Sequence, residues 1–142
     1  MANYYLNEAV FDLPARPFLD KTIHGLDAKL PGDKTLGVLV HRVPAPTGKS
    51  LRELVDDNIA LNGKRLSAYA VLEDTAAAVG GVPGFLLRMR WKSGGTTYCQ
   101  LQAHVLFQGQ IMIFAVSAPL DEQAYCDETF ASILETITWR TE

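Results

Sequence analysis

Between residues 84 and 118, apolar and polar side chains alternate in a pattern that predicts three consecutive β-strands. Short polar and glycine-containing segments at residues 92–95 and 108–110 separate these strands and predict tight turns. Because successive side chains of a strand point to opposite faces, the alternation predicts a meander whose sheet has two unlike faces.

One face of this meander is predicted to be the core. The alternate positions assigned to it are Phe85, Leu87, Met89, Trp91, Cys99, Leu101, Ala103, Val105 and Phe107. The positions assigned to the other face are Arg88, Arg90, Tyr98, Gln100, Gln102 and His104. The third strand, residues 111–116, is apolar at every position, which indicates cover on both sides. We therefore expect the face that carries Gln100 and Gln102 to bind an apolar partner that also has polar groups in need of hydrogen bonds.

The rest of the chain predicts further strands and two helices. Strands are expected at residues 4–13, 22–26, 36–42 and 66–79. Ser50 and Glu53 form a capping-box pattern that begins a helix, and Asn62-Gly63 is expected to end it. A second helix should follow Pro119 and pack on the sheet through Cys126, Phe130, Ile133, Leu134 and Ile137. This order predicts an α+β domain with an antiparallel sheet and packed helices.

Length and charge narrow the class of protein. The 142 residues, 48% of them hydrophobic and 20% charged, fit one domain spanning residues 1–142. The formal charge of −3 and the scattered basic residues argue against nucleic acid as a partner. The first residues lack a leader pattern, and no run approaches the roughly 20 apolar residues of a membrane span. We therefore expect a cytoplasmic protein that does not insert into the membrane.

Candidate reaction chemistry is sparse. Cys99 and Cys126 fall on core-facing positions and are expected to be buried, reduced thiols. The three histidines occur singly, without the spacing of a metal site, and the glycine pairs are explained by turns between strands. We therefore expect no cofactor, no metal and no catalytic residues, and regard the protein as a non-enzyme. A small hydrolase that uses His104 with a carboxylate is the enzymatic alternative.

Five segments carry a resemblance that runs over essentially the whole chain. They are residues 4–14 (YYLNEAVFDLP), 20–23 (DKTI), 39–42 (LVHR), 88–91 (RMRW) and 98–102 (YCQLQ). In these segments the chain resembles the DcrB-related domain, and within it the Eag effector-associated chaperones of type VI secretion. The resemblance implies a PsbP-like fold, an antiparallel sheet with helices.

The resemblance also implies a function. Eag chaperones are homodimeric adaptors that cradle the N-terminal transmembrane helices of a PAAR-type effector and help to load it on the secretion spike. By position, the residues of the family's binding groove fall on Ile23, Gly25, Leu39, Asn58 and Gln102. Gly25 lacks the apolar side chain that the family tends to have there, and Asn58 is shorter than the glutamine expected.

Two other interpretations stay open at this point. Ile23 and Leu39 can equally be core residues of half-buried strands, while Asn58 and Gln102 can be ordinary polar surface residues. The functional alternative is a PsbP-like structural or envelope-associated binding domain of unknown ligand.

Overall fold

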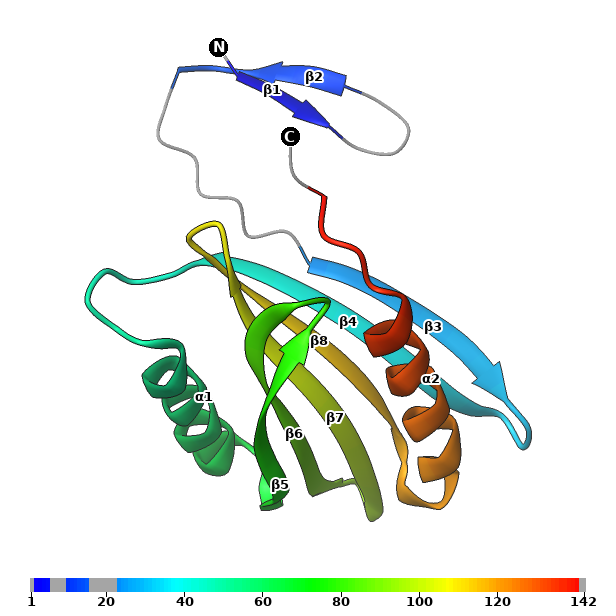
Figure 1. Cartoon of the computed structure of the whole chain (residues 1–142). Coiled ribbons are helices and arrows are strands. Elements are labelled where there is room, and N and C mark those ends of the chain that lie inside the picture. Colours follow the sequence, from blue (N-terminus) through cyan, green and yellow to red (C-terminus); the bar gives the residue numbers. More distant parts are fainter. Residues whose placement is uncertain (1, 6–9, 16–22, 141–142) are drawn as a thin grey trace.

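The computed structural model describes residues 2–5, 10–15 and 23–140, and the side chains from residue 14 onward within those ranges. Strands β1 (Ala2–Tyr5) and β2 (Val10–Leu13) form a two-stranded antiparallel sheet. The other strands are β3 (Ile23–Leu30), β4 (Lys34–Pro44), β5 (Ser67–Val79), β6 (Val82–Ser93), β7 (Thr96–Phe107) and β8 (Gln110–Pro119). They form one antiparallel sheet in the order β3-β4-β8-β7-β6-β5 (Figure 1).

Two α-helices complete the fold. Helix α1 (Leu51–Arg65) connects β4 to β5, and α2 (Gln123–Thr136) follows β8 after a short 3-10 turn, η1 (Leu120–Glu122). Figure 1 shows the two helices well apart, flanking the curved sheet. The prediction of an α+β fold with an antiparallel sheet and packed helices is therefore confirmed.

The N-terminal prediction needs a correction. A single strand was expected at residues 4–13, but β1 and β2 pair with each other, with Ala2 opposite Leu13 and Tyr5 opposite Val10. A period-two pattern does not show where the chain reverses direction within the run. The two short strands pair because each then supplies hydrogen-bond partners for the backbone groups of the other. Residues 6–9 and 16–22, which include part of the expected strand at 22–26, lie outside the described residues.

The assignment of side chains to the two faces was wrong for β6 relative to β7. Gly94 and Gly95 have positive φ angles of 58° and 79° and form a two-residue turn, so Ser93 pairs with Thr96. This register puts odd-numbered residues of β6 opposite even-numbered residues of β7: Leu87 faces Gln102, and Arg88 faces Leu101. Directly opposite residues share a face. Each face therefore carries both apolar and polar side chains.

The sheet has an apolar cluster on each face. On one face, called here the α1 face, Val55 of α1 packs with Leu87 and Met89, joined by Leu51, Ile59, Tyr69, Phe85 and Trp91. On the other, the α2 face, a larger cluster holds Leu36, Val79, Cys99, Leu101, Ala103, Val105, Val116, Ala118, Cys126 and Phe130. The sheet is thus covered by a different helix on each side.

Helix α1 begins as predicted and ends later than predicted. The Ser50 Oγ accepts a hydrogen bond from the Glu53 amide at 3.2 Å, and the Ser50 amide donates to the Glu53 carboxylate at 3.3 Å. The helix continues through Asn62-Gly63 to Arg65, and the Leu66 amide donates to the Asn62 carbonyl at 2.8 Å. Gly63 keeps a negative φ, so it extends the helix instead of ending it.

Helix α2 packs on the sheet through the predicted stripe. Cys126 and Phe130 are buried in the α2-face cluster, and Ile133, Leu134 and Ile137 pack against it. The prediction of buried, reduced thiols is confirmed, because Cys99 and Cys126 are both free and buried, with their sulfurs 3.9 Å apart. The contact with Cys99 and burial together raise the pKa of the Cys126 thiol.

Two glycine substitutions should have opposite effects on stability. A Cβ on Gly84 of β6 would lie 2.5 Å from the backbone carbonyl oxygen of His104, whereas a Cβ on Gly63 meets only Tyr69, at 3.9 Å. We predict that Gly84→Ala lowers the free energy of unfolding by about 1–3 kcal/mol, because the strand must shift. Gly63→Ala should raise it by about 0.5–1 kcal/mol through helix propensity. Urea denaturation measures both, and equal effects would contradict this packing.

Candidate functional site

The α1 face is covered by its helix over only part of its width. Helix α1 packs against β5, β6 and β7, and Figure 1 shows it on the side of the sheet away from β3. Among the described residues, no helix lies over the part of this face formed by β3, β4 and β8. This uncovered part is where four of the five predicted groove residues lie or border.

The strand register brings three of the predicted residues into one row across the sheet. Gly25 of β3 pairs with Leu39 of β4, Leu39 with Ala115 of β8, and Ala115 with Gln102 of β7. We call this the Leu39 row. The Leu39 side chain lies over the glycine, because a Cβ on Gly25 would be 3.6 Å from Leu39 Cδ1. The missing side chain at Gly25 therefore makes room for Leu39.

The next row contains Ile23. It runs from Ile23 through His41 and Ile113 to His104, and we call it the Ile23 row. Ile23 is 58% exposed, which excludes the alternative that it is a core residue. Leu39 and Ile113 are half-buried. Toward the β3 edge the rows hold the exposed Ile23 and the half-buried Leu39 and His41. At β7 they end at Gln102 and His104, which are buried, at 7% and 1% exposed.

Asn58, the fifth predicted residue, lies on α1 and not in either row. It is half-buried, and its Oδ1 accepts a hydrogen bond from Asn62 Nδ2 at 3.2 Å. The short amide is therefore used within the helix.

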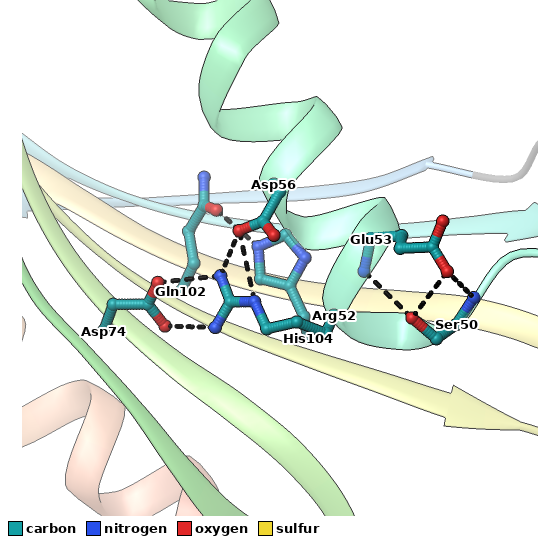
Figure 2. A network of polar contacts seen from close by, with 7 residues as sticks. All are labelled: Ser50, Arg52, Glu53, Asp56, Asp74, Gln102 and His104. Carbon is teal, nitrogen blue, oxygen red and sulfur yellow. Dashed lines mark hydrogen bonds and ion pairs between the residues drawn. The ribbon is translucent and has the colours of Figure 1, made fainter.

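A chain of polar side chains borders the uncovered part of the face. Gln102 Nε2 donates to Gln100 Oε1 at 2.6 Å, and His104 Nε2 lies 2.7 Å from Gln102 Oε1 (Figure 2 shows Gln102 and His104). An amide oxygen only accepts, so His104 donates through Nε2. We call these three residues the amide ladder. Its hydrogen bonds all run in one direction, from His104 to Gln100, and the Gln100 amide nitrogen donates to neither of the other two members.

Burial keeps the His104 ring neutral, which fixes the direction of the hydrogen bonds in the ladder. His104 is 1% exposed, and burial lowers the pKa of its imidazole to about 4, so the ring is neutral at neutral pH. A neutral ring with the proton on Nε2 is the form that donates to Gln102. The hydrolase alternative gains nothing from this geometry, because His104 bonds to an amide and not to a carboxylate.

A cluster around Arg52 fixes α1 over the other half of the face. The guanidinium donates two hydrogen bonds to Asp74 of β5, at 2.9 and 2.8 Å, and two to Asp56 of α1, at 3.1 and 2.7 Å (Figure 2). It also lies 4.5 Å above the ring of Phe85, the β6 partner of His104. This network of bidentate and cation–π contacts joins the helix to the sheet beside the ladder.

Sequence reasoning missed two parts of this site. Ile113 and Ala115 of β8 were not singled out as site residues, although a strand that is apolar on both sides was the available signal, and His41 of β4 had no such signal. The Arg52–Asp74 pair joins a helix to a strand 22 residues later, which no local spacing indicates.

Comparisons with known proteins bear on the family and the fold. The family model described as DcrB matches residues 8–136. No protein among the curated ones matches. Among the described residues, no helix is both long and apolar enough to cross a membrane.

Three solved structures resemble this fold over most or all of the chain. A protein of unknown function from Pseudomonas aeruginosa, PA94, described as a putative regulator, is 15% identical, with 100% of this chain and 99% of that chain covered and a TM-score of 0.84. LpqN of Mycobacterium tuberculosis, involved in cell envelope biogenesis, is 16% identical, with 87% and 83% covered and a TM-score of 0.58. PsbP of Synechocystis sp. PCC 6803 is 14% identical, with 79% of each chain covered and a TM-score of 0.57. At these identities the likeness shows the fold alone, and it includes the expected PsbP-like fold.

The buried histidine should make stability pH-dependent. Because the folded state keeps the pKa of His104 near 4, while an unfolded chain has about 6.5, the unfolded state takes up a proton first as the pH falls. We predict that, between pH 7 and pH 4, the wild type loses about 3 kcal/mol more unfolding free energy than His104→Gln.

Urea denaturation of both proteins at several pH values measures this difference, in which the contributions of other groups cancel. A constant difference between the two proteins across this range would contradict a buried, neutral His104.

Proposed function

The chain belongs to the DcrB family, and on this premise we propose that it is a chaperone of the Eag group. In this proposal it binds and shields the N-terminal transmembrane helices of a PAAR-containing type VI effector and aids its loading on the secretion spike. It does so as a cytoplasmic, non-enzymatic homodimer. The observation that carries the proposal is the uncovered part of the α1 face, where Ile23, Leu39 and Ile113 lie in rows that end at the amide ladder.

The chemistry of this surface suits a transmembrane helix. Such a helix in water gains about 25 cal/mol for each Å² of apolar area that a partner covers, and Ile23, Leu39 and Ile113 offer apolar side chains. Any polar group of the helix buried on the surface needs a hydrogen-bond partner, or its burial costs about 1–3 kcal/mol. At the inner end of the rows Gln102 and His104 are buried and bonded within the ladder, so the half-buried Gln100 is the ladder member that offers an amide to a bound helix.

The second candidate is an envelope-associated binding domain of unknown ligand. It is favoured by the structural likeness to LpqN, whose description places that protein in cell envelope biogenesis. The two candidates differ in what the α1 face binds, because only the chaperone requires the apolar N-terminal region of an effector.

Substitutions on the two faces of the sheet test the chaperone proposal. Ile23 and Leu26 are both exposed on β3, at 58% and 66%, but Ile23 pairs with His41 on the α1 face and Leu26 with Val38 on the α2 face. We predict that Ile23→Asp combined with Leu39→Asp weakens binding to a co-expressed PAAR-type effector at least about tenfold, because a charge is buried without a partner. Leu26→Asp should leave binding unchanged.

Affinity co-purification measures the complex, and circular dichroism checks that each variant is folded. An effector without its N-terminal apolar region should not co-purify. Undiminished binding of that truncated effector would refute the proposal, as would equal losses from the α1-face and α2-face variants.

A further inference from the structure

Two cysteines from different elements meet inside the α2-face cluster. Cys99 lies on β7 and Cys126 on α2, at positions 27 residues apart in the sequence. Their sulfurs are 3.9 Å apart, and the two residues are 3% and 0% exposed. A disulfide bond is about 2.05 Å long, so the sulfurs need to approach each other by about 2 Å. Rotation of the two side chains about their Cα–Cβ bonds moves the sulfurs over distances of this order.

The surrounding contacts hold α2 over Cys99. Asp127, the residue after Cys126, has its Oδ1 3.0 Å from Nη1 of Arg88 on β6. Phe130, one turn further along α2, is buried in the same cluster as the two cysteines. Holding two reacting groups side by side replaces a bimolecular encounter by an intramolecular one. The fold therefore favours a bond between these two sulfurs over a bond from either sulfur to another molecule.

The two thiols differ in reactivity. The hydrogen bond with Cys126 lowers the pKa of Cys99 to about 7, whereas the contact with Cys99 and burial raise the pKa of Cys126. The thiolate is the nucleophilic form of cysteine, so Cys99 attacks while Cys126 keeps its proton. Cys99 also keeps a slight exposure to solvent, while Cys126 is fully buried. Cys99 is therefore the sulfur that meets an oxidant first.

We propose that Cys99 and Cys126 form a reversible disulfide when the chain meets hydrogen peroxide, and that this bond fastens α2 to β7. In the first step the Cys99 thiolate attacks one peroxide oxygen. An S–O bond forms, the O–O bond breaks, and the leaving hydroxide takes up a proton to become water. In the second step the Cys126 sulfur attacks the sulfur of this sulfenic acid. The S–S bond forms, the S–O bond breaks, and a second water leaves with the Cys126 proton. Two thiols are thus oxidised, and one peroxide is reduced to two waters.

Hydrogen peroxide suits a buried pair because it is small and uncharged. It reaches a slightly exposed sulfur, or one uncovered by a local opening of α2, more readily than a bulky disulfide does. Disulfides inside cells are usually transient and redox-sensing. The reduced pair is therefore the resting state of the chain, and the disulfide is its oxidised state.

Mass spectrometry of the full chain after peroxide treatment tests the bond. The reduced chain is incubated with hydrogen peroxide, the peroxide is removed with catalase, and the remaining thiols are alkylated in urea. We expect both thiols to be lost together, and digestion to give a pair of peptides joined through Cys99 and Cys126 whose mass is lower by two hydrogen atoms. Dithiothreitol should restore both thiols.

The bond should also stabilise the fold. It joins positions 27 residues apart and so restricts the unfolded chain. We expect the oxidised chain to have a Tm at least about 5 °C above that of the reduced chain. Cys99→Ala and Cys126→Ala are the matched control variants, and peroxide should not raise the Tm of either one. The peptide map of the wild type locates the bond whether or not these variants fold.

Three results would each overturn the proposed disulfide. They are thiols that stay unchanged in peroxide, oxidation of Cys99 alone to a sulfinic or sulfonic acid, and disulfides found only between two chains. An unchanged Tm in the disulfide form would refute the fastening of α2. No effector takes part in these measurements, so their outcome is independent of the chaperone proposal.

Discussion

The two-residue turn at Gly94-Gly95 is the constraint on which the candidate site depends. Its positive φ angles set Ser93 opposite Thr96, and the pairing of β6 with β7 then follows residue by residue. This register puts Leu87 and Met89, which hold α1, on the same face as Gln100, Gln102 and His104. A turn longer by one residue would move one whole set of side chains to the opposite face. The helix and the amide ladder share a face because of this turn.

Much of the fold could be predicted from local patterns. The capping box at Ser50 and Glu53, the meander and the α2 stripe are signals within a few residues of each other, and the structure contains all three. The assignment of side chains to faces was wrong because alternation shows which residues of one strand share a face, but not which residues of the next strand share that face. The predicted end of α1 was wrong because a glycine near the end of a helix can continue the helix or stop it, depending on its φ angle.

Part of the candidate site was predictable from the family resemblance, and the rest depends on contacts between distant segments. Gly25, Leu39 and Gln102 were taken from a resemblance, and the register of four strands places them in one row. Asn58 lies on α1 outside that row and bonds to Asn62. The Arg52 cluster and the Cys99–Cys126 contact join segments 22 and 27 residues apart, and such contacts are set only when the chain has folded. The spacing of residues in the sequence therefore does not predict these contacts.

The central claim is that effector helices lie on the α1 face at the β3 edge. The most direct measurement is photo-crosslinking from p-benzoylphenylalanine placed at position 23 or at position 26, which are exposed on opposite faces of the same strand. The account predicts crosslinks from position 23 to the N-terminal apolar region of the effector and few from position 26. Crosslinks mainly from position 26, or equally from both, would contradict it.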